Sequence, residues 1–186
     1  STGTISTNAD RSNSGNLVNA GTTTVSGTFN LTNTGSITNL SGATLNFTGD
    51  GNWYDGALVN QGTINKNGSG GTLNLGLAGG GSRTFVNQGI LNANAGTIGL
   101  YAGGTHTGSF SAAPGALILF GQGSHVFGTG ASIVGSSSFA SSLTSATFNN
   151  GSTLGGTAAV NFGVVFNSGS TLAGTAQVQS NTLQTN

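Results

Sequence analysis

One seven-residue phrase recurs along this chain, and its spacing limits the folds that the chain can adopt. The phrase reads LTNTGSI at 31–37, LVNQGTI at 58–64 and FVNQGIL at 85–91, so the three copies are equally spaced. A second phrase, glycine followed by an alternating apolar segment, falls between these copies, as in GGTLNL at 70–75. Such repetition predicts stacked similar units, because a unit of this length buries a core only against its neighbours.

The C-terminal third repeats more closely. TFNNGSTLGGTA at 147–158 returns as VFNSGSTLAGTA at 165–176, at a shorter spacing than the copies above. VFGTGASIVG at 126–135 is a looser relative that precedes both at an intermediate spacing. Unequal spacings are typical of a coil whose core strands are constant and whose loops vary.

Each unit is predicted to consist of short β-strands. Apolar and polar residues alternate for a few residues at a time, between glycines and asparagines, and no longer stretch has helical periodicity. At roughly 20 residues per coil, the chain is expected to form about eight or nine coils. We predict one all-β domain over 1–186, with repeat coils at 15–176, an irregular segment or N-terminal coil at 1–14, and a C-terminal edge coil at 177–186.

Two architectures fit this pattern, an antiparallel sandwich and a parallel β-solenoid, and the phrase favours the solenoid. Successive coils of a solenoid lie about 4.8 Å apart and place equivalent residues one above another. A sandwich requires no such identity. The predicted columns are an amide ladder (Asn33, Asn60 and Asn87), a stacked apolar column (Leu31, Leu58 and Phe85) and corner glycines in the left-handed conformation (Gly35, Gly62 and Gly89).

Composition excludes several classes of function. Charged residues make up 3% of the chain and the formal net charge is zero, so the chain lacks the cations that nucleic-acid binding requires. It has no cysteine, which excludes disulfides and thiolate metal sites. No apolar run approaches the roughly 20 residues that span a bilayer. A neutral surface favours self-association, because little charge repulsion keeps copies apart.

Few residues are candidates for catalysis. Glycoside hydrolysis needs two carboxyl groups about 5 to 9.5 Å apart, and only Asp50 and Asp55 lie close together, with Lys66 further along. Aspartate beside glycine commonly forms a turn. We therefore expect no catalytic residue, no cofactor and no enzyme activity.

Aromatic and histidine residues are candidates for binding. Trp53 and Tyr54 are candidates for glycan contact, although strand alternation also allows one ring in the core and one on the surface. His106 and His125 are separated by nearly one coil length. Without a third ligand we expect stacked polar surface residues rather than a metal site. Threonine-rich segments such as 21–28 raise the question of ice binding, but we expect no single register of threonines.

The segments at 70–100 and 103–135 resemble the repetitive passenger regions of bacterial autotransporters and filamentous-haemagglutinin-like exoproteins. The resemblance covers most of 15–176. It implies a right-handed parallel β-helix, export across the outer membrane, and a role as a stalk, adhesin or matrix component.

These observations predict a non-enzymatic structural protein, secreted to the bacterial cell surface or extracellular matrix. Its expected partners are copies of itself or flanking coils of a longer chain, since it begins at Ser1 without a signal peptide. An alternative is a filament subunit that polymerises end to end, because neither end resembles a polar cap. A polysaccharide-active enzyme is the distant third hypothesis.

Overall fold

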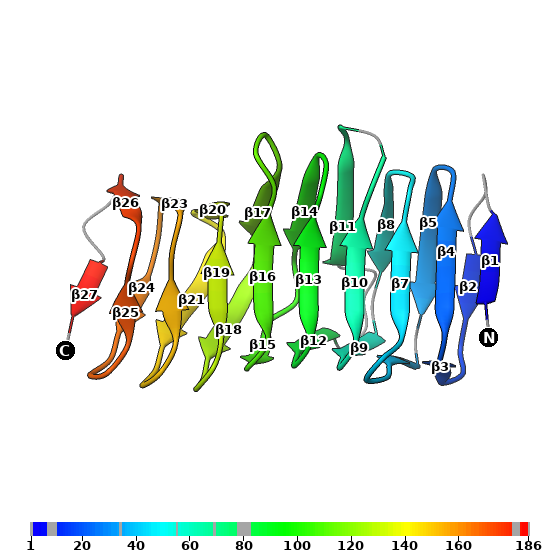
Figure 1. Cartoon of the computed structure of the whole chain (residues 1–186), viewed down its shortest axis with the longest axis horizontal. Coiled ribbons are helices and arrows are strands. Elements are labelled where there is room, and N and C mark those ends of the chain that lie inside the picture. The colour runs from blue at the N-terminus through cyan, green and yellow to red at the C-terminus, as the bar shows by residue number, and fades with distance from the viewer. Residues whose placement is uncertain are drawn as a thin grey trace.

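The coils of this protein stack along one axis. The computed structural model describes residues 2–6, 11–33, 35–54, 56–68, 70–77, 83–179 and 183–185. It is all-β, with parallel strands stacked as a β-solenoid of about seven turns, and the described residues contain no helix. The two termini lie at opposite ends of the long axis (Figure 1). The parallel β-solenoid is confirmed, and the sandwich is excluded.

Each turn contributes one strand to each of three faces, and the described strands form four parallel sheets. Sheet 1 consists of β1 (Thr2–Ser6), β4 (Thr22–Ser26), β7 (Thr44–Phe47), β10 (Thr63–Lys66), β13 (Ile90–Ala93), β16 (Ser109–Ala112), β19 (Ser132–Val134), β22 (Thr153–Leu154) and β25 (Thr171–Leu172). Sheet 2 consists of β2 (Arg11–Asn13), β5 (Phe29–Asn33), β8 (Gly51–Tyr54), β11 (Thr72–Leu77), β14 (Thr97–Leu100), β17 (Leu117–Phe120), β20 (Ser136–Phe139), β23 (Thr157–Val160) and β26 (Thr175–Val178).

The third face is divided between two sheets. Sheet 3 consists of β3 (Leu17–Asn19), β6 (Ser36–Asn39), β9 (Gly56–Asn60) and β12 (Arg83–Asn87). Sheet 4 consists of β15 (Gly104–His106), β18 (Gly123–Phe127), β21 (Leu143–Phe148), β24 (Val164–Phe166) and β27 (Leu183–Thr185). The outermost turns, which supply the first and last strands of the faces, are described only in part.

The contacts between turns reproduce the unequal spacings of the repeated phrases. Asn149 and Asn167 bond to each other across 18 residues of chain, whereas Asn60 and Asn87 bond across 27. The phrase at 126–135 also lies one turn before the phrase at 147–158, and the two are in register. Each of these spacings therefore equals the length of one particular coil.

The core is one continuous column of apolar side chains. Alternate residues of each strand point inward, as the period of two requires, and most of them are buried. Three phenylalanines stack one above another, with ring centroids 4.4 Å apart between Phe127 and Phe148 and 4.8 Å apart between Phe148 and Phe166. This stacking repeats an identical apolar contact from turn to turn.

Candidate functional site

A ladder of buried asparagine side chains runs along the third face. Asn19, Asn39, Asn60 and Asn87 lie opposite one another in β3, β6, β9 and β12. Nδ2 of Asn39 donates to Oδ1 of Asn60 over 2.8 Å, and Nδ2 of Asn60 donates to Oδ1 of Asn87 over the same distance. Asn39, Asn60 and Asn87 have no exposed surface. The ladder therefore forms inside the solenoid.

The ladder amides also donate to backbone carbonyl oxygens. Asn39 and Asn60 donate to the carbonyl oxygens of Thr63 and Ile90, each over 3.0 Å. Asn87 donates to the Ser109 carbonyl oxygen over 2.9 Å. Because the amides are satisfied in this orientation, they link successive turns without the cost of unpaired buried groups.

The phrase at 31–37 does not join this ladder as predicted. Leu31 and Asn33 belong to β5 on the second face, where Leu31 pairs with Trp53. The side chain of Asn33 lies outside the described residues. Asn39 and Asn60, which do face each other, are 21 residues apart, so the longer spacing of the first two phrases did not measure one turn. Asn39 takes the place predicted for Asn33.

The apolar column beside the ladder is corrected in the same way. Ile37, rather than Leu31, lies opposite Leu58, and Leu58 lies opposite Phe85. Ile37, Leu58 and Phe85 are each at most 5% exposed.

The predicted left-handed conformation of Gly35, Gly62 and Gly89 is wrong. None of the three has a positive φ in the left-handed region, unlike Gly42 and Gly68 with φ of 78° and 89°. A Cβ on Gly89 would instead collide with the backbone of the preceding turn at Gly62, and one on Gly62 with the carbonyl oxygens of Leu40 and Ala43. A Cβ on Gly35 would collide with the Gly15 carbonyl oxygen. Glycine is required here because successive turns approach too closely for a side chain.

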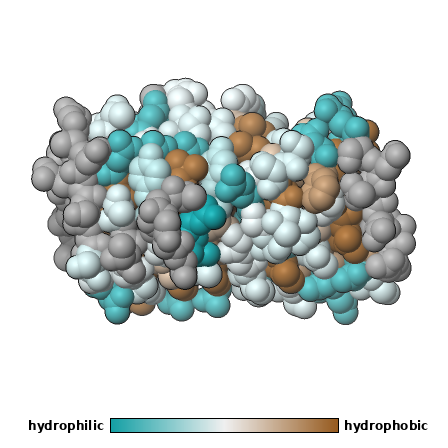
Figure 2. Space-filling view, turned by 180° about the vertical axis from the view of Figure 1, so that it is seen from behind, coloured by the Kyte–Doolittle hydropathy of each residue, from teal (hydrophilic) through white to brown (hydrophobic). Residues whose placement is uncertain are grey.

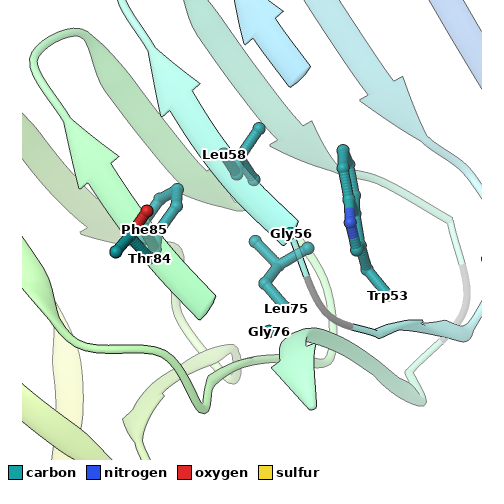
Figure 3. A pocket seen from close by; sticks show the side chains of 7 residues that line it. All are labelled: Trp53, Gly56, Leu58, Leu75, Gly76, Thr84 and Phe85. Atoms are coloured by element: carbon teal, nitrogen blue, oxygen red, sulfur yellow. The ribbon is translucent and has the colours of Figure 1, made fainter. Parts of the chain in front are cut away.

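The two candidate glycan-contact residues lie on opposite sides of β8. Trp53 is 3% exposed and belongs to the core, whereas Tyr54 points outward and is half-buried. Figure 3 shows Trp53 facing the same small internal space as Leu58, Leu75 and Phe85. The ring face of Trp53 is therefore unavailable for stacking on a sugar.

The structure brings together one acid and one base from the candidate catalytic group. Lys66 points into the solenoid with no exposed surface, and its Nζ lies 3.0 Å from Oδ1 of Asp50. Asp50 is 37% exposed, so the pair joins the interior to the surface. Asp55 lies outside the described residues. A buried ammonium beside a carboxylate is satisfied as a structural ion pair.

The two histidines meet inside the core. Nε2 of His106 lies 3.0 Å from Nδ1 of His125, and both side chains have no exposed surface. His106 pairs with Phe127 in the strand register and His125 with Gly104, so the two rings are diagonal neighbours on the inner face. The two rings stack on each other, as expected, but they lie in the core and not on the surface.

The hydrogen bonds assign a tautomer to each ring. The backbone N–H of Asn87 donates to Nδ1 of His106 over 3.2 Å, so the single proton of the neutral ring lies on Nε2. That proton is donated to Nδ1 of His125, and Nε2–H of His125 is donated to the Gln122 carbonyl oxygen over 3.0 Å. The chain of donors runs in one direction, from Asn87 to Gln122.

Both imidazoles are held in the neutral form. Desolvation lowers the pKa of His106 well below its ordinary value of 6.5, and His125 lowers it further. Desolvation also lowers the pKa of His125 to about 4, against the opposing effect of its hydrogen bond to Gln122. Phenylalanine rings surround the pair, with ring centroids of Phe110 and Phe120 each 5.1 Å from their nearest histidine.

The alternation of side chains along a strand could have predicted this burial. His125 lies two positions before Phe127 in one strand, and Phe127 is an evident core residue. Side chains two apart share one face of a strand. The alternation therefore places His125 inside, and the near-coil spacing places His106 beside it.

One column of threonines does keep its register, contrary to expectation. Thr22, Thr44 and Thr63 lie opposite one another on the outer face of sheet 1. The next residues in the column are Ile90, Ser109 and Ser132, and threonine returns at Thr153 and Thr171, so the threonine array is interrupted in the middle of the rod.

A cavity of about 180 Å³ lies among the first turns of the rod. Its lining is mainly apolar and consists of Leu17, Val18, Asn19, Thr23, Val25, Leu31, Ile37, Leu45, Phe47 and Trp53. Leu17 and Val18 are 45% and 58% exposed, and Leu172 and Val178 near the other end are 42% and 43% exposed. Apolar surface is thus present near both ends.

The described residues contain no cluster of three or more histidine, cysteine or acidic side chains suited to a metal ion. In the same part of the chain, no helix is long and apolar enough to cross a membrane. No protein-family model, curated protein or solved structure matches the chain.

Proposed function

We propose that this protein is a non-enzymatic structural rod, a stalk or adhesin segment of the bacterial cell surface or extracellular matrix that associates with its own kind. The observation that carries the proposal is the continuity of its internal columns. Asparagine and phenylalanine side chains of one turn contact their equivalents in the next. The recurring phrase thus serves to join turns.

The residues considered for chemistry also act in coil-to-coil contacts. Trp53 fills the core, and Lys66 forms an ion pair with Asp50. His106 and His125 form a hydrogen bond between two adjacent turns. These roles favour a structural function over the polysaccharide-active alternative, and the burial of Trp53 leaves glycan contact outside the proposal.

A filament subunit is the second candidate function, and the rod ends favour it. The described strands of sheets 1 and 2 end at β25 and β26, where Leu172 and Val178 are exposed. An unpaired strand edge with apolar side chains is a template for pairing with another chain. In the proposal that partner is either a second copy or a flanking coil of a longer chain.

The finer architecture and the location belong to the same proposal. We infer that the solenoid is right-handed and that the protein is secreted, on the strength of the resemblance to exported repetitive passengers. Counting the outermost turns, which are described only in part, we infer about eight or nine coils at roughly 20 residues per coil. The low charge and the neutral surface agree with a protein that packs against others. On the face shown in Figure 2, pale and teal atoms predominate among the described residues, and the hydrophobic atoms, in brown, form separate patches.

Electron microscopy at several protein concentrations tests the proposal. We expect rods that lengthen with concentration by end-to-end contact. Val178→Lys, which places a charge at the exposed end, should shorten them, whereas Val134→Lys should not, because Val134 is 50% exposed on a strand that is paired on both sides within sheet 1. Single short rods at every concentration would contradict self-association. Turnover of a neutral or acidic polysaccharide would revive the enzyme hypothesis.

A further inference from the structure

The third face is interrupted at one place, while the other two faces continue past it. Sheet 3 ends at β12 and sheet 4 begins at β15. Sheet 1 continues through β13 and β16, and sheet 2 through β14 and β17, with every described residue of those strands in register. The junction between β12 and β15 is therefore a discontinuity on one side of the rod.

His106 links the two sides of this junction, and His125 lies one strand beyond it. Backbone bonds there include Phe85 N–H to the Gly103 carbonyl oxygen and Thr107 N–H to the Asn87 carbonyl oxygen, each 3.0 Å long. The N–H of Asn87 is bonded to the His106 ring instead of to a carbonyl of the next strand. His106 in turn bonds His125 of β18. A side-chain contact thus replaces part of the missing sheet.

Neither ring can accept a further proton and keep its bonds. Nδ1 of His106 already accepts the Asn87 N–H, and Nδ1 of His125 already accepts Nε2–H of His106. A proton on either nitrogen would point one donor at another. Protonation of His106 therefore breaks the hydrogen bond that crosses the junction, and protonation of His125 breaks the bond that holds the His106 ring in place. Either event also places a charge in the core.

The packed elements offer no anion to offset that charge. Around the pair, β12, β16, β17 and β18 contribute the rings of Phe85, Phe110, Phe120 and Phe127. Among the described side chains of these four strands, Arg83 of β12 is the one ionisable group apart from His125. Its guanidinium donates to the carbonyl oxygens of Gly76 and Tyr101, and its charge has the same sign as an imidazolium.

We propose that the His106–His125 pair is an acid-sensitive latch, whose protonation separates β12 from β15 while sheets 1 and 2 stay paired. The open state exposes the phenylalanine core on one side of the rod. The lowered pKa values of both histidines agree with this coupling. The latch adds a conformational response to the proposed structural role and does not depend on it.

Nuclear magnetic resonance of the wild-type protein tests the first step. The chain contains two histidines, and both belong to the pair, so imidazole signals report on the latch alone. We expect both rings to keep their neutral shifts from pH 7 to well below 6.5, with His125 titrating at about 4. Titration of both rings near 6.5 would overturn the proposal, because it would show that they are exposed.

Hydrogen exchange, corrected for intrinsic rates, tests the second step on the same sample. Below the titration midpoint we expect amides of 83–87 and 104–106 to exchange on the order of tenfold faster. Amides of β20 and β23 and the fluorescence of the single buried tryptophan, Trp53, should not change. Simultaneous acceleration in all strands, or none at the junction, would overturn local opening.

A double variant distinguishes an acid response caused by the histidines from one caused by the three aspartates of the chain. His106→Asn with His125→Gln removes both titrating rings and should abolish the acid-induced acceleration. The control Thr105→Ala with Ser124→Ala changes exposed neighbours and should retain it. An acid response that survives in the histidine variant would overturn the proposal. If that variant does not fold, the wild-type titration and exchange still decide the question.

Discussion

At the residue scale, the asparagine ladder shows why this chain repeats a polar side chain at a buried position. The side-chain amides of Asn39 and Asn60 each donate one hydrogen bond to the asparagine of the next turn and one to a backbone carbonyl oxygen. The amide therefore links turns in one register, because a slip would leave buried donors and acceptors without partners.

Asn60→Ala should be strongly destabilising. It removes the acceptor of Asn39 and the donor to Asn87, so we expect a loss of about 3 kcal/mol in the free energy of unfolding. The control is Asn65→Ala, which removes a half-buried amide that donates to Asn46 on the outer face and should cost less than about 1 kcal/mol. Urea denaturation measures both; equal losses would show that burial of the ladder is unimportant.

Gly89→Ala tests the close approach of the turns. The new Cβ would collide with the backbone of Gly62 and Gln61, which cannot move without shifting a whole turn, so we expect a loss of more than about 2 kcal/mol. A Cβ on Gly70 meets nothing within 4 Å, and Gly70→Ala should stay within about 0.5 kcal/mol of wild type. A neutral Gly89→Ala in thermal or urea unfolding would disprove the steric role.

At the element scale, local alternation predicted the strands but not which strands become neighbours. The phrases at 58–64 and 85–91 do occupy adjacent turns, whereas the similar phrase at 31–37 begins on another face. Similarity between two phrases does not show how many of the residues between them form corners, so it does not give the length of one turn. The near-coil spacing of His106 and His125 did predict that they lie one above the other. Their place in the core was missed, because the expectation of polar surface residues did not apply the strand alternation that puts both on the inner face.

The buried histidines predict a pH dependence of global stability. Their pKa values are lowered from 6.5 in the folded protein, that of His125 to about 4, so the unfolded chain binds more protons between these values. The contribution of the neutral histidines to the free energy of unfolding is fully present above pH 6.5. It falls as the pH decreases below this value, by up to about 1.4 kcal/mol per pH unit for each histidine.

Urea unfolding at a series of pH values checks this slope. His106→Asn with His125→Gln should flatten it between pH 6.5 and 4, whatever its effect at neutral pH. A wild-type stability that does not change across this interval would show that the rings are not buried in the neutral form.

At the scale of the whole molecule, repetition and low charge sufficed to predict a stacked parallel solenoid. They did not predict the interruption of the third face, because no repeated phrase marks the junction between β12 and β15. The glycine conformations were also beyond the sequence, since close approach of two turns is a property of their packing. A rod of this kind has a length that grows by one strand spacing for each turn.

Distances between spin labels on one outer column test this account most directly. The chain has no cysteine, so Thr44→Cys with Ser132→Cys, and Thr22→Cys with Thr171→Cys, each provide two unique attachment sites. The pairs are separated by four and seven strand spacings in sheet 1, which correspond to about 19 Å and about 34 Å between backbones. The account predicts measured distances that increase in proportion to the number of intervening strands. Distances that do not follow the strand order of sheet 1 would contradict the stacked solenoid.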